Sequence, residues 1–213
     1  MDLSRPFAVV TPTLDGEVLA VLAGADTEFT SGDVLRLLGD RSSRGVRLVL
    51  DRLADQGIVT RRSAGRAWLY TLNREHVAAD AVLALAGLRA SFLRRLAIAV
   101  SEWPDPPLFA ALFGSAATRG HTAGSDIDVF LVRPEGVDED EWESLVTHLV
   151  AAATRWTGND TRPLVLSESE VSAWVAHGEP VVADVAEHGI TFYGDPGWLR
   201  ARTHRDKYNN ATN

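Results

Sequence analysis

The stretch LFGSAATRGHTAGSDIDVFLV, residues 112–132, decides the fold that we expect for this chain. Two apolar runs of strand length, residues 107–113 and 127–132, flank its polar loop, and the second is rich in β-branched and aromatic residues. Because side chains alternate along a strand, Asp126 and Asp128 should share one face of it. Two adjacent carboxylates repel each other unless a hard cation bridges them, so the pair predicts ligands for Mg²⁺.

The polar loop begins with Gly114 and Ser115. A glycine lets the backbone approach a polyphosphate closely, and the Ser115 hydroxyl and the amides after it can donate hydrogen bonds to phosphate oxygens. His121, in the same loop, could touch a phosphate, but we expect it to be a solvated loop residue. The stretch therefore predicts a combined metal and nucleotide site.

Gly114-Ser115 followed by Ser125-Asp126-Ile127-Asp128 resembles the motif of the DNA polymerase β-like nucleotidyltransferase superfamily, especially its minimal and antibiotic nucleotidyltransferases. That motif runs G-S-x-A-R-G, a short loop, then S-D-I-D, on a strand-turn-helix-strand unit. The spacing from the serine to the first aspartate is kept here, whereas the Arg-Gly pair is displaced by one place. The resemblance implies an α/β (α+β) domain with a mixed sheet flanked by helices. It also implies two Mg²⁺ ions on Asp126 and Asp128, and a nucleotide held by Gly114, Ser115, Arg119 and Ser125.

Enzymes of this superfamily use a third carboxylate on the neighbouring strand, which orients or deprotonates the attacking hydroxyl. The strand that we expect there, residues 162–166, contains no acid. Asp160, just before it, is the best substitute, because Glu168 and Glu170 are better explained as caps of the next helix. The catalytic set implied by the resemblance is therefore Asp126, Asp128 and Asp160.

Composition bounds the class of protein. The chain has 213 residues, 46% of them hydrophobic and 23% charged, enough for a real core. It has no cysteine, which excludes disulfides and thiolate metal sites. No apolar run approaches the span of a bilayer, and residues 1–10 do not read as a signal peptide, so we expect a cytoplasmic protein.

Charge is unevenly distributed along the chain. Residues 1–75 contain 10 Arg and 10 Asp or Glu, so residues 76–213 carry the whole net charge of -8. Within residues 36–74, however, nine Arg face three Asp, a local charge of +6. A basic island in an acidic chain is typical of a nucleic-acid-binding module joined to another domain.

The basic island has the order of a winged helix-turn-helix. Helical patterns over residues 14–22, from Thr30 or Ser31 to Gly39, and from Ser42-Ser43 to Gly57 precede strands over 58–62 and 68–72 around a turn at 63–65. The segment resembles bacterial winged-helix repressors, whose second helix enters the major groove while the wing follows the backbone or minor groove. The alternative is a solvated arginine face on a protein-interaction module. The resemblance implies that duplex DNA is contacted by Ser43, Arg44, Arg47, Arg61, Arg62 and Arg66.

Four segments follow: a DNA-binding domain at 1–75, a connecting helix at 76–104, a nucleotidyltransferase domain at 105–199 and a polar tail at 200–213. The connecting helix has apolar residues spaced by three and four, and it could also be the seam of a homodimer. Past residue 133 we expect helices over 137–156, 167–178 and 180–189, and strands over 162–166 and 190–193.

The function implied is a DNA-binding nucleotidyltransferase that moves a nucleoside monophosphate from Mg-NTP to a hydroxyl of a protein, RNA or small molecule. Minimal nucleotidyltransferases often act as antitoxins on a partner protein, and a DNA-binding half would allow autoregulation. The alternative is a transcriptional regulator whose nucleotidyltransferase domain has decayed into a nucleotide sensor or interaction surface. The missing third acid favours the alternative, and the intact Ser-Asp-Ile-Asp favours the enzyme.

Overall fold

The computed structural model describes residues 1–118 and 120–203, which divide into two compact units. The first unit contains Asp2 and residues 4–89, and the second contains Met1, Leu3 and the residues from Ala90 onward. The boundary falls inside the segment 76–104 that we expected to connect two domains. In the described part of the chain, no helix combines the length and apolar character needed to cross a membrane.

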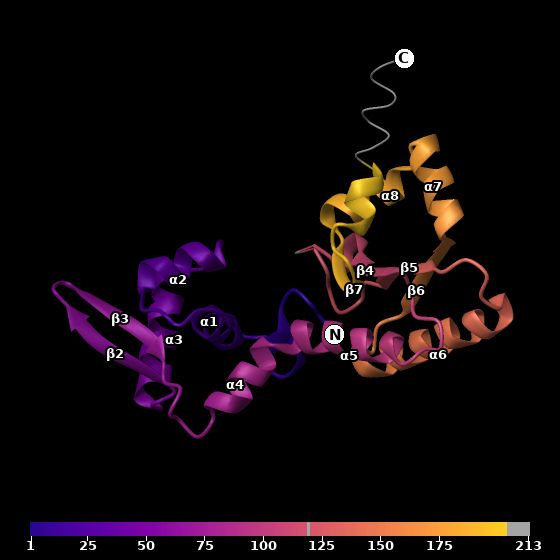
Figure 1. Ribbon diagram of the computed structural model, residues 1–213. Helices are drawn as coiled ribbons and strands as arrows, with labels where there is room; N and C mark the ends of the chain where they lie inside the picture. The colour runs from indigo at the N-terminus through magenta and orange to yellow at the C-terminus, as the bar shows by residue number, and fades with distance from the viewer. Residues whose placement is uncertain (119, 204–213) are drawn as a thin grey trace, which may run out of the picture. The chain divides into compact units, whose positions relative to one another are not determined.

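The first unit packs short helices against a small antiparallel sheet with the strand order β1-β3-β2 (Figure 1). Its core is formed by Val18, Val34, Val46 and Leu50, all fully buried. The three helices and the hairpin predicted within residues 14–72 are confirmed, whereas β1 is too short for a sequence pattern to reveal. The elements are η1 (Pro6–Val9), α1 (Leu14–Ala23), β1 (Phe29–Thr30), α2 (Ser31–Leu38), α3 (Ser43–Asp55), β2 (Val59–Ala64), β3 (Ala67–Leu72) and α4 (Ala79–Ala86).

The hairpin turn is tighter than the sequence suggested. Strands β2 and β3 stay paired as far as Ala64 and Ala67, which leaves Gly65 and Arg66 as a two-residue turn. Gly65 has φ +64°, as the favoured two-residue hairpin turns require. The turn expected at Ser63 to Gly65 is therefore wrong, because Ser63 and Ala64 continue the strand.

The second unit is built on a mixed sheet with the strand order β6-β5-β4-β7. Strand β4 runs antiparallel to β5 and β7, while β5 and β6 are parallel and are joined through α6. The predicted α+β class, with a mixed sheet flanked by helices, is confirmed for this unit. Its elements are α5 (Leu88–Ser101), β4 (Phe109–Phe113), η2 (Gly114–Ala116), β5 (Ile127–Arg133), α6 (Glu139–Thr157), β6 (Thr161–Ser167), α7 (Glu168–His177), α8 (Pro180–His188) and β7 (Ile190–Gly194).

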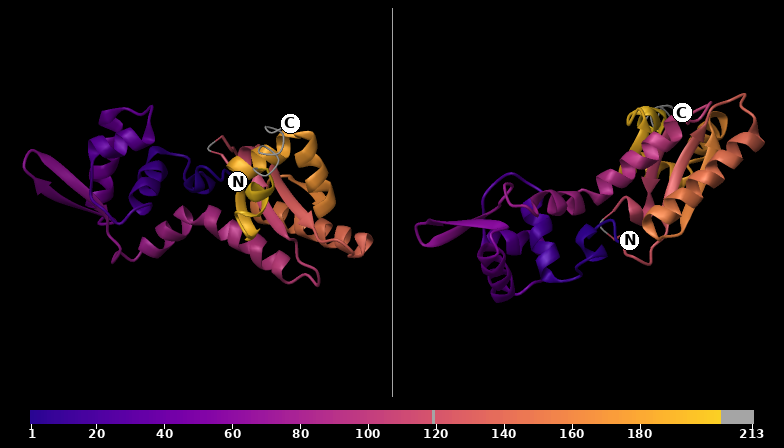
Figure 2. Two further views of the ribbon diagram at one scale, coloured as in Figure 1. Left: turned by 45° about the horizontal axis from the view of Figure 1, so that its top comes forward. Right: turned by 90° about the horizontal axis from the view of Figure 1, so that it is seen from below.

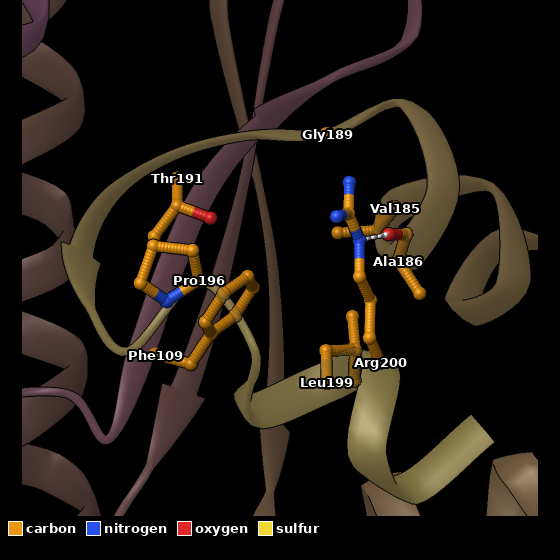
Figure 3. A pocket seen from close by; sticks show the side chains of 8 residues that line it. All are labelled: Phe109, Val185, Ala186, Gly189, Thr191, Pro196, Leu199 and Arg200. Atoms are coloured by element: carbon orange, nitrogen blue, oxygen red, sulfur yellow. Dashed lines mark hydrogen bonds between the residues drawn. The ribbon is translucent and has the colours of Figure 1, made fainter. Parts of the chain in front are cut away.

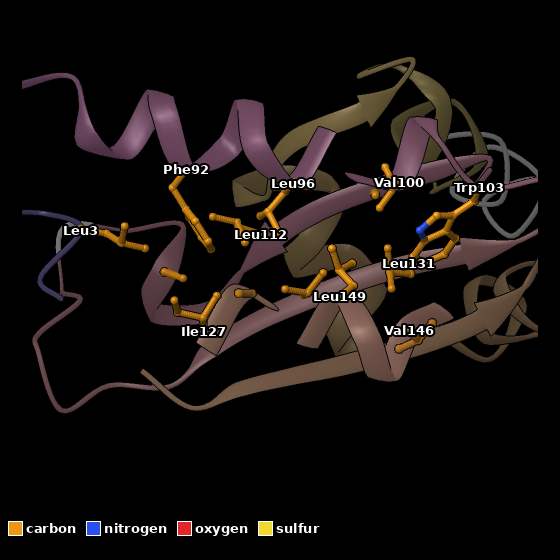
Figure 4. Close-up of a cluster of buried hydrophobic side chains, with 14 of the residues drawn as sticks. Leu3, Phe92, Leu96, Val100, Trp103, Leu112, Ile127, Leu131, Val146 and Leu149 are labelled. Carbon is orange, nitrogen blue, oxygen red and sulfur yellow. The ribbon is translucent and has the colours of Figure 1, made fainter. Parts of the chain in front are cut away.

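Helices cover both faces of this sheet. Helices α5 and α6 lie on one face, and α7 and α8 lie on the other (Figures 1 and 2). Alternate residues of β5 follow this division: Ile127 and Leu131 pack with Leu96 of α5 (Figure 4), while Phe130 packs with Val185 of α8. Alternation therefore places Asp128, the second residue of β5, on the face of the sheet that α7 and α8 cover.

The segment expected as one long helix or two in line is two helices, α4 and α5, with Gly87 between them. Val82 of α4 is buried in the first unit, and Phe92 and Leu96 of α5 are buried in the second. The apolar positions that a dimer seam would need are thus largely covered within the chain itself. Ile98 differs, because 53% of its surface is exposed.

Candidate nucleotide and metal site

Asp126 and Asp128 lie at the entrance to β5, half-buried and two residues apart. Burial is the main cause that raises the pKa of the Asp128 carboxyl, and the negative charge of Asp126 raises this pKa further. The pair is therefore electrostatically unfavourable by itself and would be relieved by a cation. This is the behaviour expected of hard oxygen ligands for Mg²⁺.

Gly114 stands directly beside Asp128. Strand β4 ends at Phe113, whose pairing partner on β5 is Asp128, and the chain then turns at Gly114 with φ +60°. A Cβ atom on Gly114 would lie 2.7 Å from Oδ2 of Asp128, closer than any side chain could come without displacing the carboxylate. The glycine thus supplies both the left-handed backbone and the open space at the carboxylate. Ser115 follows it in η2, half-buried.

A polar turn holds the loop that leads into Asp126. The Ser125 hydroxyl accepts a hydrogen bond from the Thr122 amide at 3.1 Å. Buried Asn159 donates through Nδ2 to the carbonyl oxygens of Ala123 and Ser125, at 3.1 and 2.9 Å. The hydroxyl of Ser125, predicted to bind nucleotide, is thus engaged in shaping this turn. Sequence reasoning missed Asn159, because its partners lie more than 30 residues away.

Arg162 lies on the neighbouring strand, where the resemblance implies a third carboxylate. In the parallel register of β5 and β6 it is the partner of Asp128. Its Nη1 lies 2.7 Å from Oδ2 of Asp126, and its Nε lies 3.3 Å from Oδ2 of Asp160. One guanidinium group therefore contacts both carboxylates. Asp160 itself is largely exposed, and its carbonyl oxygen accepts a hydrogen bond from the Ile127 amide at the start of β5.

His121 is buried, so the expectation of a solvated loop residue is wrong. Only 1% of its surface is exposed, and its Nδ1 accepts a hydrogen bond from the Leu3 amide at 3.2 Å. His121 is among the influences that lower the pKa of Asp128, which places the ring within electrostatic reach of the carboxylate pair. The segment at Leu3, far away in sequence, is what covers it. Arg119, which was predicted to bind nucleotide, lies outside the described residues.

The site offers two carboxylate ligands for a cation, and Asp160 is near. Within residues 1–118 and 120–203, no three His, Cys, Asp or Glu side chains are grouped so that they could hold a metal ion. Two carboxylates are nevertheless enough for Mg²⁺ at a phosphoryl-transfer site, where substrate oxygens and water complete the coordination shell. The residues present therefore fit Mg²⁺ that arrives with a triphosphate.

A cavity of about 220 Å³ lies on the same face of the sheet but at the other end of β4 (Figure 3). Phe109, Val185 and Leu199 supply apolar walls, and Arg200 crosses its edge with Nε 2.7 Å from the carbonyl oxygen of Ala186. Phe109 begins the strand that Phe113 ends, so the cavity is separate from the carboxylate pair.

Residues 93–162 match the model of a family described as nucleotidyltransferase domain. The matched range begins in α5 and ends at Arg162, so it includes Gly114, Asp126, Asp128 and Asp160. This part of the chain is similar to nucleotidyltransferase domains. This match supports a nucleotidyltransferase enzyme, and it coincides with the part of the second unit that carries the site.

Solved structures of toxin–antitoxin complexes are distantly similar. One complex with AMP-PNP is 15% identical, with a TM-score of 0.38 over 57% of this chain and 86% of that chain. The tri-AMPylated HEPN toxin of Shewanella oneidensis with its MNT antitoxin is 13% identical, with a TM-score of 0.38 over 58% and 87%. At these TM-scores the likeness assigns neither substrate nor partner. No curated protein matches the chain significantly.

The residues predicted to contact DNA lie on α3 and on the hairpin of the first unit. Ser43 begins α3 behind the Ser42 cap, whose Oγ accepts a hydrogen bond from the Gly45 amide at 3.0 Å. Arg44 and Arg47 are exposed on this helix, and Arg66 is exposed at the hairpin turn. In the part of the chain that the structure describes, none of these three arginines forms an ion pair.

Arg61 and Arg62 differ, because acidic residues neutralise them. Arg61 lies 3.3 Å from Asp51 and stacks over Trp68, and Arg62 lies 2.5 Å from Glu28. Four acids that precede residues 36–74 in the sequence, and were therefore not counted in the local charge, pair with arginines of that segment. The pairs are Asp15 with Arg52, Glu17 with Arg41, Asp26 with Arg74 and Glu28 with Arg62. The local charge of +6 therefore overstates the free positive charge of this unit.

Proposed function

We propose that the chain is a nucleotidyltransferase that transfers a nucleoside monophosphate from an NTP to a hydroxyl group, with a protein as the preferred acceptor. The observation that carries the proposal is Gly114, which leaves open the space beside the Asp128 carboxylate within the matched nucleotidyltransferase domain. The choice of a protein acceptor rests on the resemblance of the motif to minimal nucleotidyltransferases.

In this mechanism Asp126 and Asp128 hold the metal–triphosphate complex at the start of β5. Mg²⁺ bound there supplies neutralisation of the charge that develops on the phosphates. Gly114 and Ser115 bind the triphosphate beside the two carboxylates. Asp160 accepts the proton of the acceptor hydroxyl, whose oxygen forms a bond to the α-phosphorus while the bond from the α-phosphorus to the bridging oxygen of pyrophosphate breaks.

Incubation of the full chain and its co-purified partner with α-³²P-NTP tests the proposal. Label should appear on the partner in the wild type and be lost in Asp128→Ala, which should also lose Mg²⁺-dependent NTP binding. Asp160→Ala should keep NTP binding while the rate falls by roughly 10² to 10⁴, as removal of a general base does. Glu143→Ala removes an exposed acid from α6 and should behave as the wild type. Label that persists in Asp128→Ala would refute the assignment.

A second candidate function is favoured by Arg162, which lies on β6 where the resemblance implies an acid. In that case the domain is a nucleotide sensor of a transcriptional regulator, and the wild type binds Mg-NTP but labels no acceptor. Asp160→Ala would then change neither nucleotide binding nor DNA binding. An absence of Mg²⁺-dependent NTP binding in the wild type would exclude both candidates.

For the first unit we propose a winged helix-turn-helix that binds duplex DNA. The element order of α1, β1, α2, α3 and the β2–β3 hairpin supports this proposal, with α3 as the major-groove helix. Arg44, Arg47 and Arg66 are the cations best placed to meet phosphates, because no acid among the described residues pairs with them. Arg61, Arg62 and Ser43 would contribute less. Autoregulation of the chain's own promoter would follow from joining the two activities.

A further inference from the structure

Arg162 places a positive charge between two carboxylates of the proposed site. Its Nη1 is 2.7 Å from Asp126 and its Nε is 3.3 Å from Asp160, and its strand position pairs with Asp128. The positive charge of Arg162 also lowers the pKa of Asp128, against the effects of burial and of Asp126. One guanidinium group thus interacts electrostatically with all three acids of the proposed site.

We propose that Arg162 is an internal counter-ion that a divalent cation must displace from Asp126 before the site is loaded. This inference rests on the proposed nucleotide site. The guanidinium hydrogen bond occupies part of the coordinating capacity of the Asp126 carboxylate, and a fixed positive charge beside a cation site weakens cation binding. Metal alone therefore binds poorly to the free protein.

A bound nucleotide would weaken the competition between Arg162 and the cation for Asp126. A triphosphate brings negative charge to the site, and a guanidinium group released from Asp126 is suited to bind phosphate oxygens in a bidentate way. Arg162 thereby makes metal binding and nucleotide binding favour each other, and linkage requires that the coupling be reciprocal. Asp160, which is held by the same guanidinium, is also freed to meet the acceptor hydroxyl when Arg162 turns to the phosphates.

The test is the affinity of the full chain for Mn²⁺ alone, without nucleotide, measured from the EPR signal of free Mn²⁺. Arg162→Gln removes the charge from a side chain that is 63% exposed, so folding should be preserved. It should bind Mn²⁺ more tightly by on the order of tenfold, the size expected from one partly screened charge contact. Arg162→Lys keeps the charge and should stay close to the wild type.

Two further variants give the test its specificity. Arg133→Gln breaks another short ion pair, Arg133 with Glu139, at the other end of β5, and it should leave Mn²⁺ affinity unchanged. Adding Asp126→Asn to Arg162→Gln should abolish the gain, because the gain acts through that carboxylate. In a second titration, ATP should tighten Mn²⁺ binding more in the wild type than in Arg162→Gln.

The outcomes separate this inference from the function on which it rests. Mn²⁺ affinity in Arg162→Gln equal to or below that of the wild type, or a gain that survives Asp126→Asn, would overturn the counter-ion role while leaving the transferase intact. No Mn²⁺ binding by any variant, with or without ATP, would overturn both the inference and the proposed nucleotide site.

Discussion

Gly114 and Asp128 face each other so closely that a single methyl group on Gly114 would lie 2.7 Å from Oδ2 of Asp128. The first consequence is a prediction for Gly114→Ala. The substitution forces alanine into a left-handed conformation, which costs roughly 1–2 kcal/mol, and it pushes the carboxylate out of place. We expect a lower melting temperature. The loss in the free energy of Mg²⁺-dependent NTP binding should exceed the loss in the free energy of unfolding.

Gly124→Ala is the matched control. Gly124 lies in the same loop, before Ser125, and a Cβ atom there would meet nothing within 4 Å. This variant should keep the melting temperature and the NTP affinity of the wild type. Equal NTP affinity in Gly114→Ala and Gly124→Ala, measured by isothermal titration, would contradict the role assigned to Gly114.

Asp128→Asn should stabilise the metal-free protein at neutral pH. Burial and the charge of Asp126 raise the pKa of Asp128 in the folded state, so the folded protein binds this proton more tightly than the unfolded chain. The wild type therefore loses stability, relative to a neutral variant, as the pH rises from about 4, the unfolded value of an aspartate, through the raised pKa. Thermal unfolding should show a higher melting temperature for Asp128→Asn at pH 7, and the difference should shrink toward pH 4.

Added Mg²⁺-ATP provides the complementary measurement. It should raise the melting temperature of the wild type but not that of Asp128→Asn, because only the wild type keeps both proposed ligands. If metal-free Asp128→Asn were less stable than the wild type at pH 7, the ionised Asp128 carboxylate would stabilise the fold, contrary to this prediction.

Local sequence patterns could predict much of this site. Alternation alone placed Asp126 and Asp128 together, and the serine and glutamate at 167 and 170 form the expected capping box at the start of α7. Arg162 could not be assigned in this way, because its position opposite Asp128 depends on the parallel register of strands separated by α6. His121 escaped for the same reason, since the residue that covers it, Leu3, lies 118 positions away.

The charges of the first unit could not be predicted fully from the sequence either. Counting arginines in a window predicted a strongly basic surface, yet Glu17 and Glu28, outside the window, pair with Arg41 and Arg62. The Arg41 hydrogen bond is the largest cause that lowers the pKa of Glu17, and Arg62 does the same for Glu28. Which charges are neutralised is a property of the folded chain, so composition can indicate a nucleic-acid-binding class but cannot select the contacting residues.

Asn159→Ala tests whether the turn before β5 is needed to position Asp126. It removes both hydrogen bonds to the carbonyl oxygens of Ala123 and Ser125, which should destabilise the second unit by about 1–3 kcal/mol. Asn159→Asp keeps an acceptor for the Met1 ammonium group but sets a carboxylate oxygen against the two carbonyl oxygens, so it should also disturb the turn. We expect NTP affinity to fall in both variants at temperatures where circular dichroism shows them fully folded. Unchanged affinity in the folded variants would mean that the turn contributes to stability only.

The last prediction concerns DNA and rests on the difference between paired and unpaired arginines. Each phosphate contact contributes about 0.9 to the slope of log affinity against log salt concentration. Arg47→Ala combined with Arg66→Ala should therefore weaken binding to a duplex from the chain's own promoter and flatten the slope by roughly 1.8. Arg36→Ala is the matched control, because that exposed arginine on α2 is already paired with Asp33 at 2.9 Å. Fluorescence anisotropy over a series of salt concentrations measures both quantities. A slope that is the same in the double variant, Arg36→Ala and the wild type would exclude α3 and the hairpin turn as the DNA-contacting surface.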